Sequence, residues 1–211
     1  MTGVKICGLV RPEDARFADS VGADYLGVVF APSPRRRTEE QARRIWEGTA
    51  ARRVGVFMDA AEEDVLRRAR DLELAVVQLH GSEDADYCRK IRKAGSWEVW
   101  KAARVIDGDT LSQALDAYAD VADGVLLEGW SDRGPGGVGA SFDWTMAASI
   151  SGSWPSDLQL ILAGGLNADN VTDAIDQVQP DIVDVSSGVE AALGIKDHDA
   201  VKAFVSAAKT R

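Results

Sequence analysis

Short apolar segments alternate with longer amphipathic segments along the whole 211-residue chain. Each short segment has the length and composition of a buried strand, and each longer one has helical periodicity. Strands that alternate with helices form parallel sheets, because the helix carries the chain back across the sheet. The expected strands are Val4–Cys7, Tyr25–Phe30, Arg53–Phe57, Ala75–Leu79, Glu98–Ala102, Gly124–Leu127, Leu158–Ala163 and Ile182–Val185.

Eight strand-helix units in about 200 residues suit closure into a barrel. The prediction is therefore an α/β fold, a single-domain (βα)8 TIM barrel over residues 1–211, with its catalytic face at the carboxyl ends of eight parallel strands. An open doubly wound sheet is the alternative. We rank it lower because no strand near the start of the chain leads into a G-x-G-x-x-G turn.

Several helices have recognisable starts. Pro12 suits a first turn, Thr38 begins a capping-box pattern, and Asn167 and Asp197 are candidate caps for the last two helices. The fifth helix is weakly signalled, and Ser149–Asp157 is expected to be an irregular loop.

The charge and cysteine content exclude several classes of protein. A formal net charge of −10 argues against non-specific nucleic-acid binding, which requires a basic surface. Two cysteines provide no disulfide framework, and the chain enters its first strand too early for a signal peptide. No apolar run reaches the roughly 20 residues of a membrane helix. We expect a cytosolic monomer that acts on a small anionic substrate.

Strand parity brings polar side chains into the barrel. On the first strand Val4 and Ile6 share the face expected to meet the helices, so Lys5 and Cys7 point inward. Unpaired buried charge is costly, so such an interior indicates an enzyme. The same reasoning places Gln78, His80, Glu128, Asp184 and Ser186 inside.

Cys7 and Glu128 each end a predicted strand and thus face one mouth. A thiol and a carboxyl can serve as base and acid for moving a proton within a substrate, without a metal or redox cofactor. Lys5 and Gln78 are expected to contact the substrate from the same interior. Lys5 can favour the thiolate electrostatically, although strand spacing is expected to keep it from direct contact with Cys7.

Two glycine-containing loops indicate a phosphate site. Gly164-Gly165 follows the seventh strand, and Ser186-Ser187-Gly188 follows the eighth, the usual phosphate position in this class of barrel. Each loop taken alone fits a simple tight turn as well as it fits a phosphate site, but the two together favour a phosphate site. Gly136, Gly137 and Gly139 lie in a long loop after Glu128 and are expected to form a lid, not a dinucleotide fingerprint.

Seven segments, in order along the chain, together resemble the phosphoribosylanthranilate isomerase family. They are Lys5-Ile6-Cys7-Gly8, Ser33-Pro34-Arg35, Val54-Gly55-Val56-Phe57, Val77-Gln78-Leu79-His80-Gly81, Gly136-Gly137-x-Gly139 with Phe142-Asp143-Trp144, Leu162-Ala163-Gly164-Gly165-Leu166, and Val183-Asp184-Val185-Ser186-Ser187-Gly188-Val189-Glu190.

The resemblance implies an Amadori rearrangement of N-(5′-phosphoribosyl)anthranilate in tryptophan biosynthesis. By motif, Cys7 resembles the general base at C2′ and Glu128 the general acid at the ring oxygen. Arg35 resembles the group that meets the anthranilate carboxylate, and His80 and Asp184 match positions near the reacting ribose or its amine.

Three departures and two alternatives accompany this resemblance. Glu128 stands where the family usually has Asp, which moves the carboxyl by about 1 Å or more; Val10 and Val138 replace expected threonines. The alternatives are the related isomerase of histidine biosynthesis, alone or in a bifunctional version, and a catalytically weak phosphate-binding barrel. We further expect Cys88 to pack in the core, and His198 and Arg36 to face solvent.

Overall fold

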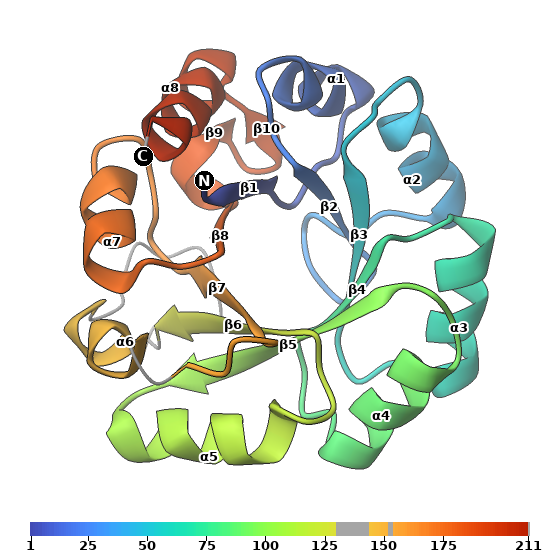
Figure 1. Ribbon diagram of the computed structural model, residues 1–211. Coiled ribbons are helices and arrows are strands. Elements are labelled where there is room, and N and C mark those ends of the chain that lie inside the picture. The colour runs from blue at the N-terminus through green and yellow to red at the C-terminus, as the bar shows by residue number, and fades with distance from the viewer. Residues whose placement is uncertain (130–143, 152–153, 211) are drawn as a thin grey trace.

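The computed structural model describes residues 1–129, 144–151 and 154–210 and forms a closed barrel of parallel strands. Figure 1 looks along the barrel, with the strands in a ring and the helices outside it. The barrel closes where β1 pairs with β8, with Val4 opposite Val183. The strands are β1 (Gly3–Ile6), β2 (Tyr25–Val29), β3 (Arg52–Phe57), β4 (Val76–Leu79), β5 (Glu98–Val105), β6 (Gly124–Gly129), β7 (Gln159–Ala163) and β8 (Ile182–Val185).

A helix follows each strand and covers the outside of the barrel (Figure 1). The helices are α1 (Pro12–Ser20), α2 (Glu39–Trp46), α3 (Glu62–Asp71), α4 (Ala85–Lys93), α5 (Gly108–Tyr118), α6 (Trp144–Ser151), α7 (Val171–Val178) and α8 (His198–Lys209). In the described part of the chain, no helix has both the length and the apolar composition needed to cross a membrane. The predicted (βα)8 architecture is confirmed.

Strand alternation divides the apolar residues into two cores. Val4 and Ile6 belong to the large core between sheet and helices. A smaller core fills the barrel and includes Val54, Trp100 and Leu126. Because Lys5 and Glu128 have the parity of the inner set, they point into the barrel as predicted.

Local signals at helix starts are mostly confirmed. Thr38 and Gln41 form a reciprocal capping box on α2, and the Asp197 side chain accepts a hydrogen bond from the N–H of Ala200. Asn167 is not the cap of α7: its side-chain oxygen accepts from the N–H groups of Asp169 and Asn170, so it closes the preceding turn. Asn170 occupies the N-cap position.

Two features differ from the sequence prediction. Helix α6 extends to Ser151, so the first residues of the expected loop Ser149–Asp157 are helical. A two-stranded hairpin of β9 (Glu190–Ala192) and β10 (Ile195–Lys196) follows β8 and the short 3-10 turn Ser187–Val189. The strands β9 and β10 are too short to show a period of two, which is why they escaped prediction.

Candidate active site

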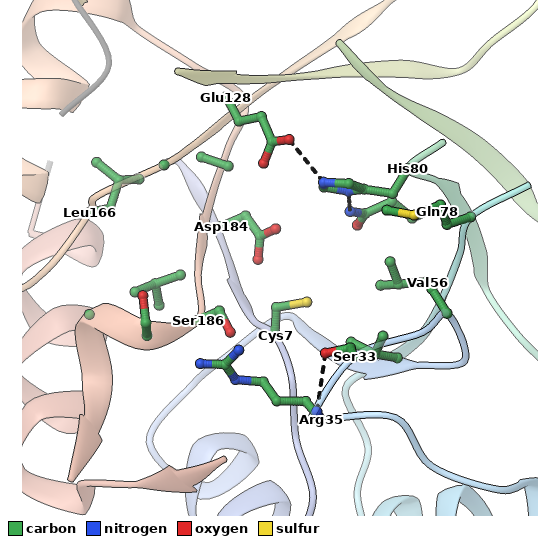
Figure 2. Close-up of a pocket in the computed structure, with 18 of the residues that line it drawn as sticks. Cys7, Ser33, Arg35, Val56, Gln78, His80, Glu128, Leu166, Asp184 and Ser186 are labelled. Carbon is green, nitrogen blue, oxygen red and sulfur yellow. Dashed lines mark hydrogen bonds and ion pairs between the residues drawn. The ribbon is translucent and has the colours of Figure 1, made fainter. Parts of the chain in front are cut away.

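Residues from many strand ends line one cavity of about 230 Å³ at the mouth of the barrel (Figure 2). Eleven of the predicted site residues are among its walls: Cys7, Arg35, Gln78, His80, Glu128, Gly164, Gly165, Asp184, Ser186, Ser187 and Gly188. Lys5 is fully buried and meets the site through Asp184. The predicted lid residues Gly136, Gly137 and Gly139 lie outside the described residues, as does Val138.

Cys7 follows the last residue of β1 and continues its ladder, because its N–H donates to the carbonyl of Val185 at 2.8 Å. The residue is only 8% exposed. Burial raises the pKa of the thiol, and this effect outweighs the lowering by the charge of Lys5. At neutral pH the thiol is largely protonated.

A buried ion pair lies beside Cys7. Lys5 Nζ donates to Asp184 Oδ2 at 2.8 Å, and both side chains are almost completely buried. Although burial alone would lower the pKa of Lys5, the charges of Asp184 and Cys7 raise it above its ordinary value. The second carboxylate oxygen, Asp184 Oδ1, is buried without a hydrogen-bond partner among the described residues. It is an acceptor that a donor group of a bound ligand can satisfy.

Glu128 ends on the opposite side of the cavity, within reach of His80 (Figure 2). His80 Nε2 lies 3.0 Å from Glu128 Oε1, and His80 Nδ1 lies 3.0 Å from Gln78 Nε2. Arg104 Nε lies 3.9 Å from the same Glu128 oxygen.

The environment of Glu128 favours the ionised carboxylate. Burial raises its pKa, but the hydrogen bond and charge of His80 and the charges of Arg104 and Lys101 outweigh burial, so the pKa lies below its usual value. A proton donor at neutral pH needs a raised pKa, so the described surroundings of Glu128 do not by themselves favour its protonated form. No sequence pattern predicted that His80 would reach the carboxylate of Glu128.

Arg35 lines the cavity, but one edge of its guanidinium is already occupied. Its Nε and Nη2 donate to the two oxygens of Glu190 at 2.7 and 2.6 Å. Lys196 Nζ donates to Glu190 Oε1 at 3.0 Å and to the carbonyl of Ser186 at 2.8 Å. The hydrogen bond to Glu190 raises the pKa of Arg35, whereas burial lowers the pKa of Lys196 despite the attraction of Glu190.

The Arg35–Glu190–Lys196 cluster was not predicted as part of the site. Glu190 was recognised only as the last residue of a segment that resembles the family. No role was predicted for Lys196, because the hairpin that contains it was not predicted. Glu190 and Lys196 side chains are 5% and 0% exposed. Charges so buried are retained only in pairs, so the hairpin is fixed against the loop that carries Arg35.

The two glycine-containing loops meet at one wall of the cavity. Gly164 and Gly165 have φ values of +91° and +70°, a left-handed conformation that glycine adopts without a Cβ penalty. At Gly188 a Cβ would lie 1.9 Å from the carbonyl oxygen of Leu166, so only glycine lets the loops approach. The wall is thus shaped by backbone, which suits an anion held by N–H groups.

Comparison with known proteins gives consistent matches across the chain. The model of the family described as N-(5'phosphoribosyl)anthranilate (PRA) isomerase matches residues 4–207. A protein named N-(5'-phosphoribosyl)anthranilate isomerase from Chromohalobacter salexigens is 44% identical, with 97% of this chain and 93% of that protein covered. A protein of the same name from Trichlorobacter lovleyi is 45% identical, with 99% and 98% covered.

Solved structures match equally well. The crystal structure of phosphoribosyl anthranilate isomerase from Thermotoga maritima has a TM-score of 0.91 and 42% identity, with both chains fully covered. A crystal structure of phosphoribosyl anthranilate isomerase in complex with reduced 1-(o-carboxyphenylamino)-1-deoxyribulose 5-phosphate has a TM-score of 0.87 and 40% identity, again with full coverage.

Proposed function

The chain belongs to the N-(5'-phosphoribosyl)anthranilate isomerase family, and we propose that Cys7 and Glu128 are the base and the acid of its reaction. The protein is an isomerase of tryptophan biosynthesis that converts the aminoaldose phosphoribosylanthranilate into 1-(2-carboxyphenylamino)-1-deoxyribulose 5-phosphate. The observation that carries the assignment of roles is that a thiol and a carboxyl from β1 and β6 line one cavity with the glycine-containing loops of β7 and β8.

The reaction requires two proton transfers. Glu128 gives a proton to the furanose oxygen, and the C1′–O bond opens to leave a protonated imine at C1′. The positive nitrogen acidifies the C2′–H bond, so the Cys7 thiolate, a modest base, can remove that proton. The electron pair forms the C1′–C2′ double bond of an enolamine, which then tautomerises to the aminoketose.

Both anionic ends of the substrate have a complementary wall. The backbone at Gly164, Gly165, Ser187 and Gly188 would hold the phosphate, since amide N–H groups and glycine loops suit that ligand. Arg35 would meet the anthranilate carboxylate with the edge of its guanidinium that Glu190 leaves open. Asp184 Oδ1 and His80 line the same cavity and would contact the ribose or its amine.

Steady-state turnover of freshly generated phosphoribosylanthranilate tests the proposal directly. The wild-type protein should convert it, whereas Cys7→Ser and Glu128→Gln should each bind a product analogue and turn over poorly. Binding without turnover by the wild-type protein would instead match the catalytically weak phosphate-binding barrel. Loss of binding in both variants would point to a structural role for these residues.

We also propose that the enzyme acts in the cytosol as a monomer. Two free, buried cysteines suit a reducing compartment. A Thermotoga maritima relative is described as dimeric, so a dimer is the alternative state to test. Size-exclusion chromatography with light scattering distinguishes the two states.

A further inference from the structure

Gln78 holds a buried amide whose oxygen has no partner. The residue is 1% exposed, its Nε2 lies 3.0 Å from His80 Nδ1, and its Oε1 has no hydrogen-bond partner among the described residues. A buried polar atom without a partner is unfavourable, because the hydrogen bonds it loses with water are not replaced. Asp184, which lines the same cavity, also has a buried oxygen without a partner among the described residues, Oδ1. Two unpaired acceptors in one cavity cannot satisfy each other, because neither carries a hydrogen.

A half-turn of the amide about its last torsion exchanges the two atoms without moving the rest of the side chain. The oxygen then faces His80 Nδ1, and the NH2 group faces the cavity that also contains Asp184. An oxygen at 3.0 Å from Nδ1 makes a hydrogen bond only if Nδ1 carries a proton. This orientation therefore selects the tautomer of His80.

We propose that Gln78 is a positioning residue that holds the proton of His80 on Nδ1 and thereby keeps a proton on the His80–Glu128 pair. The contact of 3.0 Å between His80 Nε2 and Glu128 Oε1 requires one proton between the two atoms. A neutral imidazole carries one proton. If that proton is on Nδ1, the proton between His80 Nε2 and Glu128 Oε1 is a second one, shared by the pair. The pair then stores the proton that Glu128 must deliver to the ring oxygen.

This inference rests on the proposed role of Glu128 and reconciles it with the surroundings of the carboxyl. Burial raises the pKa of Glu128, but the hydrogen bond and charge of His80, with the charges of Arg104 and Lys101 from β5, outweigh it. The other ionisable groups that line the cavity in the described chain are Asp184 and Cys7 from the opposite wall and Arg35. With this lowered pKa, the carboxyl itself is ionised at neutral pH. A pair whose His80 is committed to Nδ1–H can still hold the transferable proton.

The protonation of Nδ1 can be read directly by nitrogen NMR of the isotopically labelled protein. The chain has only two histidines, His80 and His198, so a single His198→Asn variant assigns both rings. At a pH where the enzyme is active, we expect His80 Nδ1 to show the shift of a protonated ring nitrogen. An unprotonated Nδ1 with a protonated Nε2 would overturn the proposal, whatever the kinetics show.

Two substitutions of Gln78 supply the kinetic test. Gln78→Met keeps the length but has no strong acceptor, so kcat should fall about 10-fold or more with less than about 3-fold change in affinity for a product analogue. Gln78→Glu keeps an acceptor at Nδ1 and should retain more activity than Gln78→Met. Equal losses in both variants, or a loss of affinity that matches the loss of kcat, would refute the positioning role.

Glu128→Gln separates this inference from the proposed function. If Glu128→Gln remains active, the acid lies elsewhere and the proposed role of Glu128 fails. If it is inactive while His80 carries its proton on Nε2, only the role of Gln78 fails.

Discussion

The two sides of the cavity hold the proposed base, Cys7, and the proposed acid, Glu128, in different ways. On the base side, Cys7 lies beside buried ion pairs of Lys5 with Asp184 and of Arg35 and Lys196 with Glu190. On the acid side, Glu128 has a hydrogen-bonded chain through His80 to the buried amide of Gln78 in place of an ion pair with a buried cation.

This difference separates two tasks. A base that works through a buried thiol benefits from a fixed electrostatic field, and paired buried charges supply one that cannot easily rearrange. An acid must be reloaded with a proton after each turnover, and a histidine with two exchangeable sites permits this. The base side is therefore a rigid scaffold, whereas the acid side contains a proton that can move.

The largest expected effect comes from removing the base. Cys7→Ser should fold normally and lose about 10³-fold or more in kcat, because an alcohol is a far poorer base than a thiolate. The ion pairs beside residue 7 would remain, but no thiolate would be present to remove the proton from C2′. Circular dichroism should be unchanged, and retention of more than about a tenth of the wild-type kcat would remove Cys7 from this role.

The pH profile of the wild-type enzyme sharpens the same point. A thiol whose pKa is raised by burial is protonated below that pKa, so the thiolate fraction increases about tenfold per pH unit up to it. Where chemistry limits the rate, kcat should rise with pH beyond the value of about 8.5 typical of free cysteine. A flat acidic limb contradicts the assignment.

Glu128→Gln tests the acid side and should lower kcat about 10²-fold or more with little change in affinity for product. Gln cannot supply the proton, although it still fills the space beside His80. The matched control is Glu128→Asp, which keeps the carboxyl but is one methylene shorter, and it should remain active. If the control is as inactive as Glu128→Gln, contact with His80 matters more than the acid itself.

Gly165→Asp should disturb phosphate binding on the wall between the two sides. A like charge facing the phosphate costs several kcal/mol, so KM should rise about 100-fold. Asp and Asn both tolerate the left-handed backbone found at Gly165, so Gly165→Asn is a control for bulk without charge and should have a smaller effect. A phosphate-bearing ligand bound away from these loops in a crystal would refute the placement.

Arg35→Ala should weaken binding of an anthranilate-bearing product analogue about 10-fold, with a smaller change in kcat. The effect is modest because Glu190 already occupies two of the guanidinium donors, which leaves one edge for the ligand. Arg36 is exposed and serves as the control, so Arg36→Ala should change little. Equal effects in the two variants would contradict the assignment and leave Arg35 a purely structural role on the base side.

Sequence reasoning placed Cys7 at the mouth of the barrel but did not predict all of the buried ion pairs beside it. Period-two alternation places Cys7, His80, Glu128 and Asp184 inside a barrel, because parity is a property of the backbone. Glu190 and Lys196 were missed because they meet Arg35 across more than 150 residues of chain, through a hairpin too short to show a pattern.

On the acid side, the position of Glu128 could be predicted from the sequence, but its pKa could not. The sequence places a carboxyl at the end of β6, but its pKa depends on the distances to His80 and Arg104 and on the orientation of an amide. None of these is encoded in local periodicity. His198 is a similar case: it begins a helix as predicted, yet it stacks on Phe17 and bonds to Asp14 instead of facing only solvent.

The smallest expected effect concerns Asp14, which supports the strand that carries Lys196. The side chain of Asp14 is completely buried; it accepts two hydrogen bonds from Arg11 at 2.9 and 2.6 Å and one from the backbone N–H of Lys196 at 3.2 Å. It thus ties helix α1 to the strand that carries Lys196. Although burial raises the pKa of Asp14, these hydrogen bonds outweigh burial and lower it.

Asp14→Asn should therefore reduce the free energy of unfolding by about 1–3 kcal/mol at neutral pH. A carboxyl with a lowered pKa contributes stability above its unfolded pKa of about 3.9, and that contribution is lost as the pH falls through the folded pKa. The gap between wild type and Asp14→Asn in urea unfolding should thus close in acid. Asp86→Asn is the control, because its side chain is 79% exposed and its ion pair should contribute little. A gap that stays constant with pH would mean that Asp14 acts by packing, and that the base side does not depend on this charge.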